Sequence, residues 1–110
     1  MEFNEYQALA ARTINGELTP IEMRLHALHL MASEVGEIHG IYQKGYQGHE
    51  IAETELKKEV GDLLWGIAEY CTSHGWFLNE IASMNIEKLR KRYPDGFETS
   101  RSVNREEYKK

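Results

Sequence analysis

The stretch "TPIEMRLHALHLMASEVGEIHGIYQK", residues 19–44, decides the fold of this chain. Thr19 is a natural N-cap, Pro20 fits the first helical position, and Glu22 completes a capping box. The pattern predicts one long helix that ends near Lys44, because two glycines follow in "GYQGHE". Its apolar residues recur at spacings of three and four, the period of a helix with one buried face: Ile21, Leu25, Leu28, Met31, Val35, Ile38 and Tyr42.

Three further segments have helical patterns, and none reads as a convincing strand. They cover residues 3–14, 51–73 and 78–92, with Gly75 as the stop of the second and Pro94 as the end of the third. The sequence therefore predicts an all-α, four-helix, bundle-like domain whose long helices pack antiparallel and which oligomerisation completes. We assign residues 1–97 to this domain and 98–110 to a polar tail, whose end "NREEYKK" we expect to fray.

Composition excludes several classes of protein. The 110 residues suit one domain, and a net charge of -5 argues against a general nucleic-acid binder. The single cysteine, Cys71, permits no intrachain disulfide, which fits a protein of the reducing cytoplasm. Cys71 lies on an apolar helix face, so we expect it in the core. We expect no membrane association, because we find no secretory signal and no apolar run near the roughly 20 residues that span a bilayer.

Two nearly identical acidic motifs stand in the two longest helices. "EVGE" places Glu34 and Glu37 three residues apart, and "EVGD" does the same for Glu59 and Asp62. Five such acid pairs occur in the chain, so a solvated surface is the simpler interpretation of any one of them. However, Glu34 and Glu59 lie at the edges of apolar arcs, and antiparallel packing would bring all four acids together. Converging carboxylates require a cation, and oxygen ligands favour Mg²⁺ or Mn²⁺.

Three glycines lie inside these helices and weaken them. Gly36 and Gly61 stand within the acidic motifs, and Gly66 follows one turn later. Each costs up to about 1 kcal/mol relative to alanine. Such glycines usually permit close approach of the backbone to a neighbouring helix or a ligand, and here we expect the two helices to come close together.

Cationic and amide side chains follow a pattern that suits a phosphate chain. Lys44 falls on the same face as Glu37, while Asn85, Lys88 and Arg92 share one face of the last helix with apolar residues. The alternative is that the Lys88 and Arg92 side chains simply reach out to solvent. With the acids, they suit phosphates held between a metal and cations.

The chain resembles the MazG-like nucleoside triphosphate pyrophosphohydrolases, an all-α superfamily. The resemblance rests on Glu-x-x-Glu followed by Glu-x-x-Asp, and on "NEYQALAART", "EVGDLLWGIAEY" and "NIEKLRKRYPDGF", which together span nearly the whole chain. The Asn-x-x-Lys-x-x-x-Arg pattern at Asn85, Lys88 and Arg92 adds to its specificity. One departure is Ser33, where similar motifs often carry a further acid.

The resemblance implies Mg²⁺-dependent cleavage of a nucleoside or deoxynucleoside triphosphate to monophosphate and pyrophosphate, in a homodimer or homotetramer. The four acids Glu34, Glu37, Glu59 and Asp62 would hold the metal. A carboxylate not fully committed to metal can take the water proton; Glu37 is our candidate and Glu34 is nearly as good. Further substrate contacts are expected from side chains that would bind phosphates or stack on the base: Lys44, Asn85, Lys88, Arg92, Tyr93 and Trp65.

Two other functions stay open. A di-iron carboxylate enzyme would need Glu-x-x-His on a helix, and no glutamate here has a histidine three residues later. A non-catalytic helical adaptor or nucleotide-binding protein would leave its acids solvated and its stability indifferent to Mg²⁺. His26 and His29 are three residues apart, and we interpret them as surface histidines rather than metal ligands.

Overall fold

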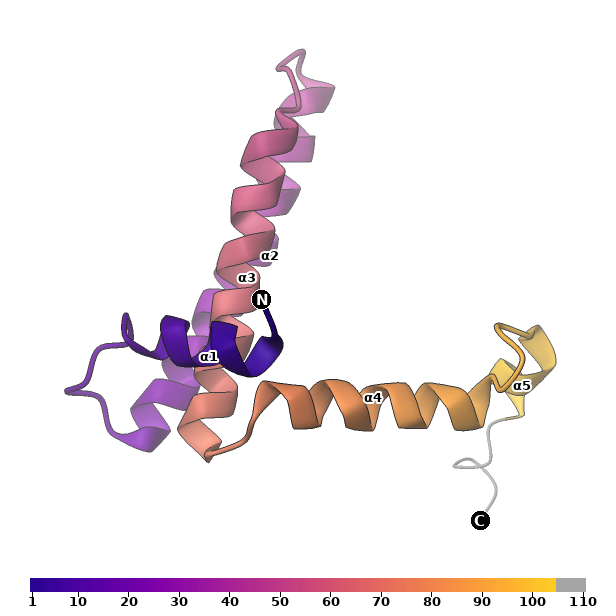
Figure 1. Ribbon diagram of the computed structural model, residues 1–110. Coiled ribbons are helices and arrows are strands. Elements are labelled where there is room, and N and C mark those ends of the chain that lie inside the picture. The colour runs from indigo at the N-terminus through magenta and orange to yellow at the C-terminus, as the bar shows by residue number, and fades with distance from the viewer. Residues whose placement is uncertain (105–110) are drawn as a thin grey trace. The chain divides into compact units, whose positions relative to one another are not determined.

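The computed structural model describes residues 1–104, and within them every regular element is a helix. The helices are α1 (Phe3–Ala11), α2 (Pro20–Tyr46), α3 (Glu53–His74), α4 (Leu78–Arg92) and α5 (Thr99–Val103) (Figure 1). The all-α class is confirmed. The sequence predicted four helices followed by a polar tail, and the structure adds the short α5 within that tail. Most of "NREEYKK" lies outside the described residues. The chain forms two compact units, Met1–Leu78 and Asn79–Lys110, and each is described by itself.

The helix ends follow local chemistry. At the start of α2, the Glu22 backbone N–H donates to the Thr19 hydroxyl (3.1 Å), and the Thr19 N–H donates to the Glu22 carboxylate (3.0 Å), which confirms the capping box. Gly75 ends α3 with φ 71°, a left-handed conformation that favours glycine. Helix α1 ends at Ala11, three residues earlier than predicted, and the Thr13 hydroxyl donates to the Ala10 carbonyl (2.7 Å) at its end.

Helices α2 and α3 form a long antiparallel hairpin (Figure 1). The Arg24 guanidinium donates to the carbonyl of Ser73 (3.1 Å), and His26 pairs with Glu69. Residue numbers therefore rise along α2 as they fall along α3, and the predicted antiparallel packing is confirmed.

Close approach of the two helices occurs at one of the three glycines. A Cβ added at Gly66 would lie 2.8 Å from Met31 Cγ and 2.9 Å from Leu30 Cδ2, both on α2. A Cβ at Gly36 or Gly61 would meet no atom within 4 Å. The interpretation of Gly36 and Gly61 as positions where the two helices approach closely was therefore wrong, because both glycines face open space in this chain.

Helix α1 packs on the C-terminal half of α3 (Figure 1). The buried Gln7 side chain joins them: its amide donates to the Trp76 carbonyl (2.8 Å) and the Thr72 hydroxyl (3.2 Å), and its oxygen accepts from the Leu78 N–H (2.7 Å). Because every polar atom of this amide is paired, Gln7 ties α1 to the turn that follows α3.

The core of the described chain is small. Its buried hydrophobic residues are Ala10, Ala27, Ala68, Cys71 and Leu78, so the core position predicted for Cys71 is confirmed. By contrast, much of the apolar face predicted for α2 is exposed, and so is Val60 on α3. The face is split because only part of it turns toward α3. Its outward residues are 41% to 66% exposed: Ile21, Leu25, Leu28, Val35 and Tyr42.

Candidate carboxylate site

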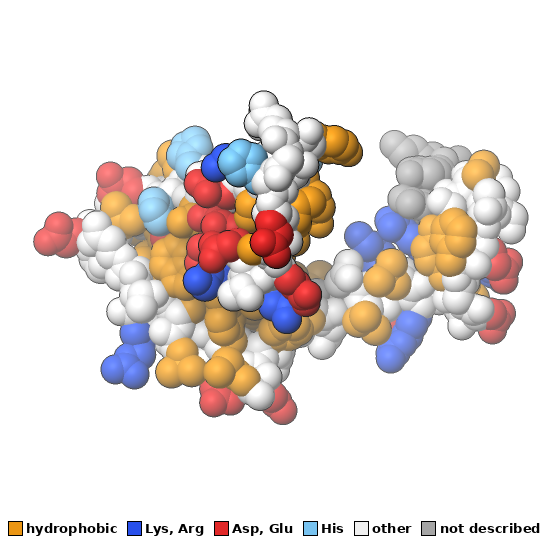
Figure 2. Space-filling model, turned by 90° about the horizontal axis from the view of Figure 1, so that it is seen from above, with side chains coloured by type: hydrophobic (Ala, Val, Ile, Leu, Met, Phe, Trp, Pro, Cys, Tyr) orange, Lys and Arg blue, Asp and Glu red, His pale blue; other side chains and the backbone are white. Residues whose placement is uncertain are grey.

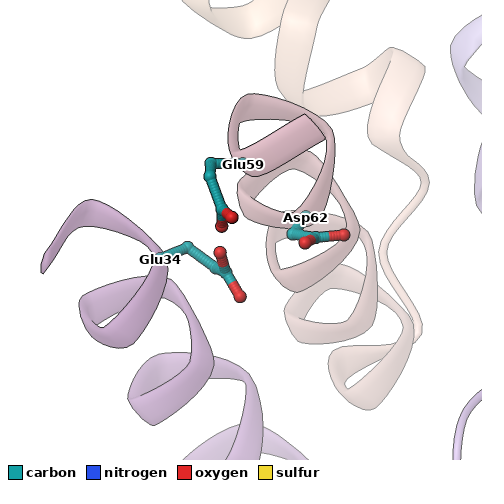
Figure 3. A group of neighbouring side chains, drawn as sticks. All are labelled: Glu34, Glu59 and Asp62. Carbon is teal, nitrogen blue, oxygen red and sulfur yellow. The ribbon is translucent and has the colours of Figure 1, made fainter. Parts of the chain in front are cut away.

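Three of the four predicted acids converge between α2 and α3. Glu34 comes from α2, and Glu59 and Asp62 come from α3; one carboxylate oxygen of each lies within 4.8 Å of the others. Figure 3 shows the carboxylates of Glu34 and Glu59 facing each other across the gap between the helices. The antiparallel hairpin brings these side chains together, because it places the turn of α2 that carries Glu34 beside the turn of α3 that carries Glu59 and Asp62.

The electrostatics of this group are unfavourable without a positive charge. The pKa of Glu34 is raised to about 7, first by a hydrogen bond with the Glu59 carboxyl, then by burial, and then by the negative charges of Glu59, Asp62 and Glu37. One oxygen of Glu34, Oε2, is buried and has no hydrogen-bond partner. A cation would supply that partner and offset the repulsion, so the residues fit a divalent metal with oxygen ligands.

The negative charge of Asp62 also acts on Tyr6 of α1. The pKa of Tyr6 is raised by burial and by the negative charge of Asp62, so this tyrosine lies within reach of the carboxylate's field. Sequence reasoning placed Tyr6 only on the apolar side of its helix. Tyr6 and Asp62 are far apart in the sequence, and only the packing of α1 on α3 brings them together.

A cavity adjoins the carboxylates. Its volume is about 430 Å³, and it is lined by Thr13, Leu30, Glu34, Asp62 and Trp65. The Trp65 indole N–H donates to the Thr13 hydroxyl (2.8 Å). Trp65, which the sequence suggested for stacking on a base, therefore lies beside the predicted metal ligands, while Thr13 was not foreseen.

Glu37 and Lys44 lie in a different place on α2. Both are exposed and line a second cavity of about 360 Å³ together with Ser33, Gly36, Gly40 and Ile41. Glu37 is thus outside the group of three, although its charge raises the pKa of Glu34. The sequence predicted that Glu37 and Lys44 lie on one face of the helix, and their place in the lining of the same cavity agrees with this. Metal binding and catalysis by Glu37 stay predictions.

The remaining predicted substrate residues belong to the second unit. Asn85 and Lys88 line a cavity of about 260 Å³ on α4 with Ile81 and Met84. Arg92 is half-buried at the end of α4, and the half-buried Tyr93 has its ring 5.3 Å from that of Phe97. Helix α4 has the bounds that the sequence predicted. Substrate binding by these residues stays a prediction.

Sequence reasoning missed a buried acid on α3. Glu69 is 1% exposed, and both of its oxygens lie close to Nδ1 of His26, at 2.7 Å and 2.9 Å. His26 is thus a half-exposed partner of Glu69, and no histidine joins the metal group found within residues 1–104. The available signal was the position of Glu69 inside the apolar run "WGIAEYC", three residues after Gly66.

The surface around the site is acidic. Figure 2 shows Asp and Glu side chains gathered in one group on the first unit, with Lys, Arg and His side chains at its edges. Within the described chain, no helix combines the length and apolar character that a bilayer span requires.

Comparison with known proteins identifies the domain type. A family model described as the MazG nucleotide pyrophosphohydrolase domain matches residues 24–97. The match includes Glu34, Glu59 and Asp62 and all of α4. No curated protein and no solved structure matched.

Proposed function

Because this chain belongs to the MazG nucleotide pyrophosphohydrolase family, we propose that it hydrolyses nucleoside or deoxynucleoside triphosphates to the monophosphate and pyrophosphate. The observation that carries the proposal is the meeting of Glu34, Glu59 and Asp62, with one buried and unpartnered Glu34 oxygen. A folded chain gains nothing from such a group unless a cation binds there.

The metal ligands are Glu34, Glu59 and Asp62, with Glu37 as the predicted fourth, and the ion is Mg²⁺ or, in its place, Mn²⁺. When bound, such an ion offsets the negative charge of the phosphates and makes water a better nucleophile. The three acids have an oxygen-only donor set, which suits a hard cation, and their spacing within 4.8 Å suits a single small ion.

The chain's own side chains supply the rest of the reaction. Glu37 is exposed and outside the group of three, so it would be the ligand least committed to the metal, and its carboxylate could accept the proton of the attacking water; Glu34 is the alternative base. Water attack at the α-phosphorus would release pyrophosphate. The cationic and amide side chains predicted to bind the phosphates are Lys44, Asn85, Lys88 and Arg92. Trp65 or Tyr93 would stack on the base.

The proposed assembly is a homodimer or homotetramer. Its support is the outward stripe on α2, where Ile21, Leu25, Leu28, Val35 and Tyr42 are exposed. They follow the spacing of four, three, seven and seven residues that a packed helix pair uses. A stripe of this length on a small domain is stabilised when a second helix covers it.

Product analysis tests the proposal. The purified chain is incubated with a panel of canonical and modified triphosphates, with and without Mg²⁺ or Mn²⁺. Metal-dependent release of monophosphate and pyrophosphate is expected, with loss of activity in Glu59→Gln. Glu53→Gln is the matched control, because Glu53 is an exposed acid near the start of the same helix.

Other products or no products would each overturn the proposal. Diphosphate with free phosphate would show that the bond cleaved is the wrong one. No turnover of any triphosphate, in either metal, would favour a non-catalytic nucleotide-binding or adaptor protein.

A further inference from the structure

The hydrogen-bond donors on the neutral side chains that line the 430 Å³ cavity are already used within the chain. Tryptophan has one polar atom, the indole N–H, and in Trp65 it donates to the Thr13 hydroxyl at 2.8 Å. The Thr13 hydroxyl has one hydrogen to donate, and it goes to the Ala10 carbonyl at 2.7 Å. Leu30, the remaining neutral residue of the lining, has no polar side-chain atom.

The Trp65 ring is held from a second side. The His26 ring meets it edge-on, with centroids 6.2 Å apart and planes at 86°. His26 is itself fixed by the buried Glu69, whose oxygens lie 2.7 Å and 2.9 Å from its Nδ1. Trp65 belongs to α3, and it is therefore restrained at its nitrogen by Thr13, in the turn after α1, and at its ring by His26 on α2. An aromatic ring restrained in this way loses little entropy when a flat ligand stacks on it.

From these contacts we propose that Thr13 is a positioning residue: it holds Trp65 as a stacking wall, and the cavity binds a nucleobase by its ring surface rather than by its edge. The inference rests on the proposed function, since it takes the ligand to be a nucleotide whose phosphates lie at the carboxylates. Stacking is tolerant of base identity, because every base has an aromatic face. A site that reads base edges needs free donors as well as acceptors, and the neutral side chains of this lining offer no free donor.

The test uses binding rather than turnover. The chain has two tryptophans, so Trp76→Phe leaves Trp65 as the only one. Quenching of its fluorescence in Mg²⁺ gives the Kd of α,β-methylene analogues of dATP, dGTP, dCTP and dTTP, which resist cleavage at the α–β bond. Tripolyphosphate, which has no base, is measured by its competition with the dATP analogue. All variants are made in the Trp76→Phe chain, and thermal melts establish that each one is folded.

Three results are expected. Thr13→Val, which keeps the shape but removes the hydroxyl, weakens the four analogues by about 2- to 10-fold, the range for one lost hydrogen bond. It leaves the inhibition constant of tripolyphosphate unchanged, and Thr13→Ser restores nucleotide binding. The Kd values of the two purine analogues differ from each other by less than about tenfold, and so do those of the two pyrimidine analogues. The control Thr54→Val, at an exposed threonine near the start of α3, changes none of these values.

Contrary results are equally clear. Unchanged nucleotide binding in Thr13→Val, or tripolyphosphate weakened to the same extent, would overturn the positioning role. A larger difference between the two purine analogues or between the two pyrimidine analogues, or no quenching by any analogue, would overturn recognition by stacking. Tight binding without hydrolysis of ordinary triphosphates would instead reject the proposed function and leave this inference standing.

Discussion

The α2–α3 hairpin carries two carboxylate contacts across the same helix interface, and they are built in opposite ways. At one, Glu69 on α3 is buried and has both oxygens near Nδ1 of His26 on α2. At the other, Glu59 on α3 faces Glu34 on α2, so an acid meets an acid. Eight residues of α2 separate His26 from Glu34, little more than two helical turns.

The difference separates a structural contact from a functional one. Glu69 has its partner within the chain, and nothing further is needed to stabilise its burial. Glu34 has a raised pKa and a buried oxygen without a partner, so its environment is completed only by something that binds. The same fold therefore holds one acid that stabilises it and another that opposes it.

The largest expected effect comes from the acid pair. Glu59→Gln keeps the shape of the side chain but removes a charge that the metal needs. The kcat/KM for triphosphates should therefore fall by at least about 100-fold, more than is typical when a residue that only supports a metal ligand is changed. The rise of the melting temperature in Mg²⁺ should also disappear. Steady-state kinetics and thermal melts measure the two effects. If Glu59→Gln kept the activity of Glu53→Gln, the metal site would lie elsewhere.

The His26–Glu69 pair should affect stability and leave metal binding intact. His26→Ala leaves the Glu69 carboxylate buried without a partner, so the free energy of unfolding should fall by about 1–3 kcal/mol. Urea denaturation measures the loss, and the Mg²⁺-dependent rise in melting temperature should persist. His29→Ala is the matched control, because His29 is exposed on the same helix. Equal stability of the two variants would show that the pair contributes nothing.

The sequence predicted the contact between the acids of α2 and α3, but it did not predict the contact between His26 and Glu69. Capping residues and local periodicity fixed the start of α2 and both ends of α4, and the repeated acidic motifs located Glu34, Glu59 and Asp62. Glu69 was missed because a glutamate in a helix is ordinarily exposed. Which apolar residues of α2 face away from α3 was not predicted, because periodicity shows that a face is apolar without showing what covers it.

Titration of Glu34 should make the metal-free protein lose stability as pH rises. Its pKa is about 7 in the folded chain against 4.5 ordinarily, so between these values the folded state holds a proton that the unfolded state has released. The free energy of unfolding therefore falls as pH rises from 4.5 to about 7. Mg²⁺ competes with that proton, so its stabilising effect should grow over the same range.

Thermal melts from pH 5 to 8, in chelator and in Mg²⁺, measure this dependence. Glu34→Gln isolates it from other titrating groups, because the amide cannot ionise. The metal-free variant should lose less stability than the parent chain over this range. Identical pH profiles for the two proteins would show that Glu34 does not titrate there.

The smallest expected effect concerns the spacing of the helices at the two contacts. Gly61 lies in the acidic motif and faces open space, so Gly61→Ala should stabilise the metal-free chain by about 0.5–1 kcal/mol through helix propensity alone. Gly66→Ala is the matched change on the same helix, but its Cβ would press on Met31 and Leu30, and overpacking should outweigh that gain. Urea denaturation should give opposite signs for the two alanines. If both alanines stabilised the chain, the close approach at Gly66 would cause no overpacking, and the two positions would not differ as expected.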